Sequence, residues 1–252
     1  MVRNMSLRLV FSDAKHWRYL IETLSTIIEE ACFIADSEGL KLKALDPSKV
    51  AMVDFFMPSE AFEEYACSTE TIIGVNFDEL KKIVKRGTAK DKFELEVEEG
   101  KTLKITFRGK AIRTFSLPIL DLGAETLPTP KIPFTSTVRV LSDAVKDAIK
   151  DAKTISDCVK FETREEEFII KASSDRGSVE IEFNRESGSL IDIEVKEPAI
   201  ATYSLDMLEK IIKAYRLSDI LVIEYATDKP ASLTFELPGG GRLTFYIAPR
   251  IG

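Results

Sequence analysis

The chain has 252 residues, of which 44% are hydrophobic and 31% charged, with one histidine, three cysteines and a formal net charge of −7. This composition is typical of a globular protein and argues against a disordered chain, and no apolar run reaches the length of a membrane span. The cysteines are far apart and odd in number, which argues against a disulfide framework or a paired zinc site. We therefore expect a cytoplasmic protein with no membrane segment, metal or cofactor.

The first half of the chain repeats one order of elements twice. A helix is predicted from Ser12 to about Ile28, and the strand-like runs CFIAD, GLKLKAL and VAMVDFFM follow it. A second helix is predicted in NFDELKKIVKRG, residues 76–87, with Asn76 as its N-terminal cap and Gly87 closing its last turn. The runs KFELEVEE, KTLKITF and AIRTFSLPI come after it. Two helix-plus-three-strand units therefore precede residue 120.

The second half repeats the same order. A helix from about Ser142 to Ala152 precedes CVKFET, EFIIKAS and SVEIEFN, and Ser204 is expected to cap LDMLEKIIKAYR before LVIEYA, SLTFEL and RLTFYIA. Each of the four helices also follows a strand candidate: LRLVF, TIIGV, TSTVRVL or AIATY. Four β-α-β-β-β units in one chain predict an α+β fold of two similar domains.

Three prolines mark the join between the halves. Pro128, Pro130 and Pro133 remove backbone donors, so this stretch cannot form a helix or a central strand. We expect an N-terminal domain at 1–119, a connector at 120–133 and a C-terminal domain at 134–252.

Basic residues lie beside the apolar stripe of every predicted helix, although the chain as a whole is acidic. Such segregation predicts a polyanion on the helical face, with four independently solvated helices as the alternative. These residues are Lys15 and Arg18; Lys82, Lys85 and Arg86; Lys146, Lys150 and Lys153; and Lys210 and Lys213.

An enzyme is the distant alternative. A metal-dependent enzyme acting on nucleic acid could use Glu165, Glu166 and Glu167, but adjacent acids on a strand point to opposite faces. His16 is not accompanied by a nucleophile motif such as GxSxG. We therefore expect no catalytic residues.

Four stretches carry a resemblance that extends from about Leu7 to Ile251. They are EACFIADSEGLKLKALDPSKV at 30–50, GVNFDELKKIVKR at 74–86, the LDL…P connector at 120–128 and FYIAPRI at 245–251. In them the chain resembles archaeal sliding clamps of the proliferating cell nuclear antigen family. The resemblance implies a ring of three subunits, with antiparallel sheets outside and helices on one inner face around duplex DNA. Such a ring tethers DNA polymerase as a processivity factor. A subunit of a heterotrimeric or checkpoint-type clamp is the alternative.

The resemblance also assigns roles to individual residues. It implies that Lys15, Arg18, Lys82, Lys85, Lys150 and Lys213 face DNA, and helical geometry adds Arg86, Lys146, Lys153 and Lys210. It implies a pocket for client peptides at Leu45, Val50, Met52, Leu127, Pro230, Tyr246, Ala248 and Pro249. It places subunit contacts at the strand runs 110–117 and 177–185, with Arg113, Phe115, Val179 and Ile181 as the expected contact residues. The expected partners are double-stranded DNA, a clamp-loader ATPase, DNA polymerase, flap endonuclease, DNA ligase and identical or homologous clamp subunits.

Overall fold

Two compact units make up the chain, whose computed structural model describes residues 5–98, 101–123 and 127–250. Unit 1 comprises Met1–Pro47, Val53–Pro128 and Leu237–Leu243, and unit 2 comprises Ser48–Met52, Thr129–Glu236 and Thr244–Gly252. The tail motif's Ile251 lies outside the described residues.

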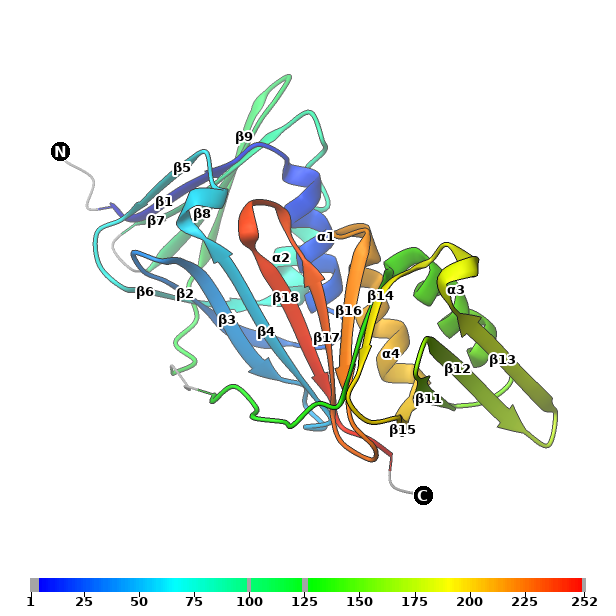
Figure 1. Ribbon diagram of the computed structural model, residues 1–252. Coiled ribbons are helices and arrows are strands. Elements are labelled where there is room, and N and C mark those ends of the chain that lie inside the picture. The colour runs from blue at the N-terminus through cyan, green and yellow to red at the C-terminus, as the bar shows by residue number, and fades with distance from the viewer. Residues whose placement is uncertain (1–4, 99–100, 124–126, 251–252) are drawn as a thin grey trace. The chain divides into compact units, whose positions relative to one another are not determined.

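Unit 1 contains the predicted β-α-β-β-β order twice, with one short strand between the two copies (Figure 1). Its elements are β1 (Met5–Phe11), α1 (Ala14–Leu24), β2 (Glu30–Ala35), β3 (Gly39–Leu45), β4 (Ala51–Pro58), η1 (Ser59–Ala61), β5 (Glu64–Cys67), β6 (Thr71–Asn76), α2 (Phe77–Val84), β7 (Lys92–Glu98), β8 (Thr102–Arg108) and β9 (Ile112–Pro118).

Unit 2 repeats this plan, again with one extra strand between the copies. Its elements are β10 (Ser136–Leu141), α3 (Ser142–Lys153), β11 (Cys158–Arg164), β12 (Glu167–Ser174), β13 (Gly177–Phe183), η2 (Arg185–Ser187), β14 (Leu190–Val195), β15 (Ala199–Ser204), α4 (Leu205–Ile211), η3 (Ile212–Arg216), β16 (Ile220–Tyr225), β17 (Ala231–Glu236) and most of β18 (Arg242–Ile247). The short turn η4 (Pro238–Gly240) before β18 is counted with unit 1. The extra strands β5 and β14 were not predicted from the sequence.

The strands form antiparallel sheets within each unit. In unit 1 one sheet has the order β5-β1-β7-β8-β9, and a second runs β4-β3-β2-β6. In unit 2 the corresponding orders are β13-β12-β11-β15 and β14-β10-β16-β17-β18. The predicted α+β fold of two similar halves is therefore confirmed.

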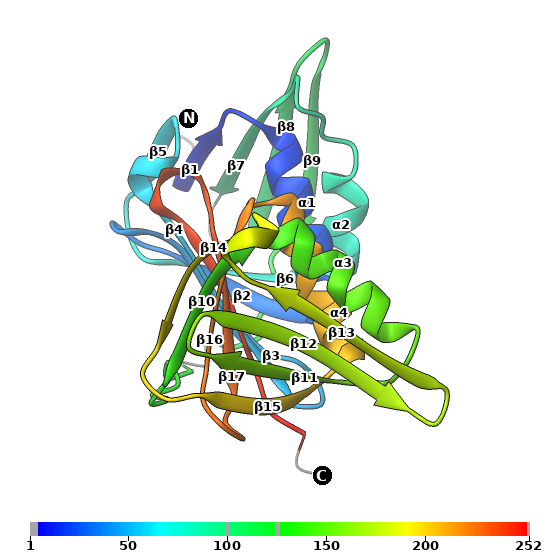
Figure 2. The same cartoon turned by 45° about the vertical axis from the view of Figure 1, so that its right-hand side comes forward.

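The helices of each unit lie side by side and bury their apolar stripes (Figure 2). In unit 1, Trp17 of α1 is 3% exposed and stacks on Phe93 with ring centroids 5.0 Å apart. In unit 2, α3 buries Val145, Ala148 and Ile149, as its spacing predicts. Burying one large apolar side chain contributes about 1.5–3 kcal/mol, so these stripes fix which helix faces remain exposed.

Two helix ends differ from the sequence expectation. The first helix ends at Leu24 rather than near Ile28, where the chain leaves it through a turn. The fourth is α-helical only to Ile211, and η3 continues it with tighter turns. Helix ends commonly tighten as the fourth one does, and the position at which a helix ends is difficult to predict from the sequence.

The predicted helix caps were partly wrong. Asn76 does cap α2, because its side chain accepts hydrogen bonds from the amides of Asp78 and Glu79. Ser204 occupies the N-cap position of α4 but makes no capping hydrogen bond with its side chain. Gly87 is not the C-cap of α2, which is Lys85, but its amide donates a hydrogen bond to the carbonyl of Val84, the last residue of the helix, at 3.0 Å. Packing also requires a glycine at this position. A Cβ atom there would lie 2.7 Å from the Phe107 ring and 2.9 Å from the Ala14 Cβ.

Candidate nucleic-acid interface and docking segments

The helix pair of unit 1 presents cations on its solvent side. Lys15 of α1 and Lys82 of α2 are exposed, as are Lys85 and Arg86 just after α2, and Arg18 is half-buried. The apolar stripe turns these side chains outward, since the buried residues of α2 are Phe77, Leu80 and Val84.

Neighbouring carboxylates compensate some of these charges. The Lys82 Nζ lies 2.6 Å from Glu79 Oε1, and this hydrogen bond raises the pKa of Lys82. The Arg18 Nε lies 3.0 Å from Glu22 Oε1. Lys85 forms no ion pair with any residue that the structure describes. Its charge is therefore the more available one for an external anion.

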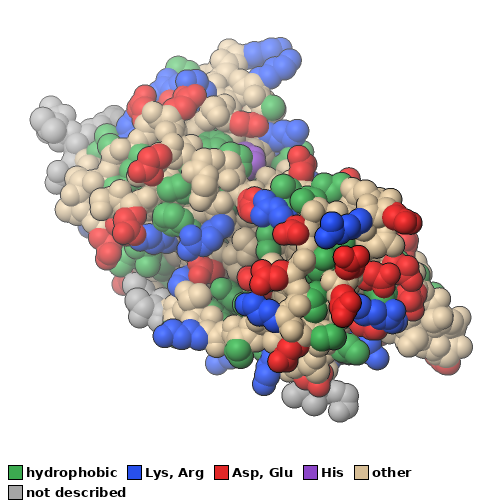
Figure 3. Space-filling model, in the orientation of Figure 1, with side chains coloured by type: hydrophobic (Ala, Val, Ile, Leu, Met, Phe, Trp, Pro, Cys, Tyr) green, Lys and Arg blue, Asp and Glu red, His purple; other side chains and the backbone are tan. Residues whose placement is uncertain are grey.

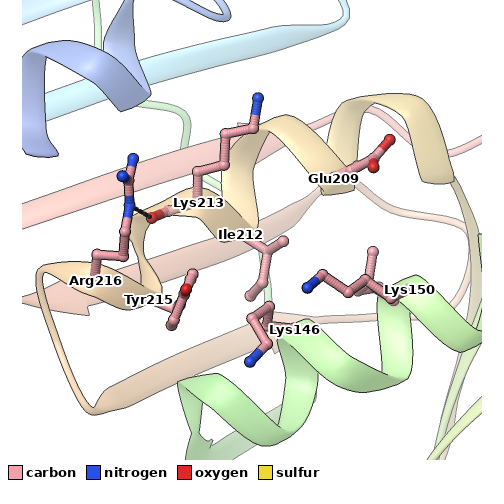
Figure 4. Close-up of a pocket in the computed structure, with 8 residues that line it drawn as sticks. Lys146, Lys150, Glu209, Ile212, Lys213, Tyr215 and Arg216 are labelled. Atoms are coloured by element: carbon pink, nitrogen blue, oxygen red, sulfur yellow. Dashed lines mark hydrogen bonds between the residues drawn. The ribbon is translucent and has the colours of Figure 1, made fainter.

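Unit 2 has a basic depression of about 300 Å³ between α3 and η3 (Figure 4). Lys146 and Lys150 enter it from α3, and Lys213 and Arg216 from η3. The full lining is Lys146, Ile149, Lys150, Glu209, Ile212, Lys213, Tyr215 and Arg216. Four cations and one carboxylate around a concave surface favour an anionic ligand.

The cations of this depression differ in how they are held. Lys146 Nζ lies 4.8 Å from the centroid of the Tyr215 ring and 3.1 Å from Asp147 Oδ1, a hydrogen bond that raises its pKa. The Arg216 Nε donates to the Lys213 carbonyl, at 3.4 Å. Lys150 and Lys213 are exposed and, within the described part of the chain, have no carboxylate partner.

Lys153, unlike Lys150 and Lys213, is paired with carboxylates. Its ammonium contacts the carboxylate of Asp206 on α4 and lies 3.5 Å from Asp157 Oδ1. The hydrogen bond to Asp206 raises the pKa of Lys153, and the same bond lowers the pKa of Asp206. The three lysines of α3 do form a row in sequence, but only Lys150 has an uncompensated charge.

Acidic and basic side chains are interspersed on the face of each unit seen in Figure 3. In unit 1, for example, Arg8 pairs with Glu64 at 3.2 Å and with Glu96, and Arg108 pairs with the buried Glu94. Ion pairs of this kind compensate the charges of the strands.

Most of the expected peptide-pocket residues belong to unit 2. Val50, Pro230, Tyr246, Ala248 and Pro249 are half-buried, whereas Met52 is buried. The Ala248 amide donates to the Val50 carbonyl at 2.9 Å, which brings the residues just after β18 beside the start of β4. Leu45, which is 39% exposed, and the half-buried Leu127 belong to unit 1.

The four expected interface residues lie on the outermost strands of two sheets. Phe115 of β9 and Val179 and Ile181 of β13 are half-buried. Arg113 of β9 is held within unit 1, because its guanidinium pairs with Asp91 at 2.8 Å and donates to the Arg86 carbonyl at 3.0 Å.

The opposite edge of the β13 sheet is partly covered. Along β15, the Asp228 amide donates to the Ile200 carbonyl and the Arg250 amide donates to the Thr202 carbonyl, at 3.1 and 2.7 Å. This leaves β13 as the longer open edge of that sheet, and open edges favour pairing with another chain.

The sequence reading missed Ile212, Tyr215 and Arg216 as part of the basic depression. The available signal was the three-residue spacing of Lys213 and Arg216, since a 3₁₀ turn places such residues on one side. The expectation that Glu165 and Glu166 lie on a strand is wrong, because the two residues form the turn between β11 and β12. Among the described residues, no group of His, Cys, Asp and Glu is arranged to hold a metal ion. None of the described helices combines the length and apolar character needed to cross a bilayer.

Two similar domains of this architecture, each with a pair of helices against antiparallel sheets, define a clamp fold. Residues 6–124 match the N-terminal domain of proliferating cell nuclear antigen, and residues 129–250 match its C-terminal domain. The chain therefore belongs to the proliferating cell nuclear antigen family.

Relatives match over nearly the whole chain. The DNA polymerase sliding clamp of Thermofilum pendens is 46% identical, covering 97% of this chain and 99% of the relative. DNA polymerase sliding clamp 1 of Pyrobaculum aerophilum is 44% identical, with 96% and 98% covered. Crystallised PCNA from Thermococcus kodakaraensis superposes with a TM-score of 0.93 at 30% identity, covering 97% of this chain and 100% of that one. A chain of the PCNA2–PCNA3 complex from Sulfolobus tokodaii gives 0.91 at 31% identity, covering 96% and 99%.

Proposed function

We propose that three subunits, each this chain or a close homologue, form a ring around duplex DNA and tether DNA polymerase to it. The observation that carries the proposal is the charge of the helix pairs: exposed cations gather there in a chain whose net charge is −7. Family membership supports the same reading. The subunit acts in the cytoplasm, with the chromosome, and catalyses no reaction itself. Its domains are 1–119 and 134–252, joined by the connector 120–133.

The helical lysines contact DNA phosphates without reading the base sequence. Lysine suits this role because its ammonium is a hydrated point charge on a flexible stem, so contacts exchange as the ring moves. The residues that have no carboxylate partner among the described residues carry the largest share: Lys15, Lys85, Arg86, Lys150, Lys210 and Lys213. The other DNA-facing residues, Arg18, Lys82, Lys146 and Lys153, each pair with a carboxylate of their own unit.

Subunits join by pairing the β9 edge of one with the β13 edge of the next. Arg113 supports the β9 side through its bond to Asp91, while Phe115 meets Val179 and Ile181. Such head-to-tail contacts close into a ring when the rotation between subunits permits it. A heterotrimer uses the same edges with homologous chains.

Client enzymes dock through a short peptide that carries a glutamine and two adjacent aromatic residues. The proposed pocket comprises Leu45, Val50, Met52, Leu127, Pro230, Tyr246, Ala248 and Pro249. Apolar side chains beside the exposed Arg250 suit an extended peptide, whose backbone pairs while its aromatic side chains fill the pocket. DNA polymerase, flap endonuclease and DNA ligase are the expected clients, and a clamp-loader ATPase opens the ring.

The ring is tested by retention on DNA of different topology. Purified chain is loaded by a clamp loader onto nicked circular DNA and onto the same DNA after linearisation. We expect retention at high salt on the circle only, because a closed ring slides off free ends while phosphate contacts weaken with salt. Equal loss from both DNAs would refute topological binding.

The docking site is tested separately by calorimetric titration with a synthetic peptide of the stated type. Micromolar binding is expected, which corresponds to about −8 kcal/mol. Tyr246→Ala should weaken it at least about tenfold, or about 1.4 kcal/mol, without changing the subunit assembly. Tyr19→Ala, an aromatic truncation on α1, is the matched control and should bind as the unaltered chain does.

A further inference from the structure

The first residues of the connector pack on the outer strand of unit 1. After β9 the Ile119 amide donates to the Lys101 carbonyl, and the Leu120 amide then donates to the Gly74 carbonyl of β6, both at 2.9 Å. Leu120 and Gly74 form an isolated antiparallel bridge. The connector therefore begins as a short extension of the β6 edge.

Gly74 has no room for a side chain on the connector's side. A Cβ atom would lie 2.1 Å from the Leu120 carbonyl oxygen, 3.0 Å from its carbon and 3.3 Å from Leu122 Cγ. The obstructing atoms of Leu120 are backbone atoms, so a rotamer change cannot relieve the clash. Gly74 is not in the left-handed region of backbone conformation. A substitution would therefore act through the connector and not through strain at residue 74.

Cys32 lies beside the contact between Gly74 and the connector, so the accessibility of its thiol indicates whether the connector is in place. It is paired with Gly74 across the β2–β6 ladder, and its thiol lies 3.7 Å from the Gly123 carbonyl oxygen. The connector thus covers Cys32 at the same place where it meets Gly74. Cys67 contacts the Ala35 and Thr69 carbonyls instead, and Cys158 belongs to unit 2.

We propose that Gly74 is a positioning residue for client docking. Because it has no side chain, residues 120–123 can pack against β6. The connector held in this way presents Leu127 to the client peptide. This inference rests on the docking site proposed above. A preformed connector binds a peptide more tightly because less chain must be ordered on binding. Loosening its start should weaken docking without touching a pocket residue.

The test is Gly74→Ala in the full chain, with two measurements. Maleimide labelling, followed for each cysteine by mass spectrometry, should be at least about threefold faster at Cys32 and unchanged at Cys67 and Cys158, because a thiol reacts according to its accessibility. Affinity for the client peptide should fall about fivefold to tenfold. Ile72→Ala, on the same face of β6 and 42% exposed, is the matched control and should change neither.

A second variant separates seating from general instability. Leu120→Pro removes the amide that bonds to Gly74 while leaving the strand intact, and should reproduce both effects. If Gly74→Ala accelerates the labelling of all three cysteines, that variant is unfolding, and Leu120→Pro then becomes the test of whether the connector is held on β6.

Three results would overturn the inference. Unchanged Cys32 labelling in both variants would show that Gly74 does not seat the connector. Faster labelling with unchanged peptide affinity would show that the seat does not serve docking. If the unaltered chain binds no peptide, the docking site itself fails, and the role of Gly74 in docking fails with it.

Discussion

The ammonium of Lys153 on α3 contacts the carboxylate of Asp206 on α4. The contact lowers the pKa of Asp206, so the pair stays ionised under mildly acidic conditions. A cation that is paired with a carboxylate of its own unit attracts a DNA phosphate less strongly. Asp206 thus neutralises part of the positive charge on the unit 2 helices.

Removing the negative charge of Asp206 should strengthen DNA binding. In Asp206→Asn the charge of Lys153 is released, and we expect tighter binding to duplex DNA together with a salt dependence steeper by about one phosphate contact. Fluorescence anisotropy over a series of salt concentrations measures both. Asp151→Asn on the exposed side of α3 removes the same charge without freeing a lysine, and should have a smaller effect. Equal effects of the two variants would count against a specific role for the pair.

The helical lysines should differ in importance according to their partners. Lys85→Gln and Lys150→Gln each remove an uncompensated charge, whereas Lys82→Gln removes one that Glu79 already neutralises in part. We therefore expect a larger loss of DNA retention from the first two variants. All three should unfold at nearly the same temperature, because exposed lysines, with or without an ion-pair partner, contribute little to stability. Equal losses of DNA retention from all three variants would show that ion pairs within the subunit do not change how much each lysine contributes to DNA binding.

The β13 edge should control assembly. Ile181→Asp places a charge in the proposed subunit contact, and burying an unpaired carboxylate there is unfavourable. We expect light scattering to report a mass near that of one subunit, with circular dichroism unchanged. Ile191→Asp, on the exposed side of β14, is the control and should assemble normally. A trimer that persists in Ile181→Asp would place the contact elsewhere.

His16 should make the fold less stable in mild acid. Its Nε2 atom is buried and has no hydrogen-bond partner among the described residues, and burial lowers its pKa below the usual 6.5. The unfolded chain therefore takes up this proton at a higher pH than the folded one. The contribution to stability is fully present above about pH 6.5 and is lost as the pH falls toward the lowered folded-state pKa.

Urea unfolding at several pH values measures this contribution. We expect the free energy of unfolding to fall between about pH 7 and pH 5, and to fall less in His16→Gln, which cannot take up a proton there. Since the chain has no other histidine, the difference between the two proteins isolates this group. Identical pH profiles would contradict the assignment.

Much of the fold could be predicted from spacing alone. The stripes of α1 and α3, the cap at Asn76 and the fourfold β-α-β-β-β order all follow from contacts between residues near in sequence. The strands β5 and β14 were not predicted because neither has a buried apolar face: no residue of β5 is buried, and Leu190 is the one buried residue of β14.

The sequence by itself determined where the helices lie and that cations flank their apolar stripes, because helical periodicity is a local property. Only the tertiary structure decided which cations remain uncompensated and why residue 74 must be glycine. Lys153 meets Asp206, and Gly74 meets Leu120, across long separations in the chain. Ion pairing and steric exclusion both depend on separations of a few ångströms, which are fixed only when the packed elements bring distant segments together.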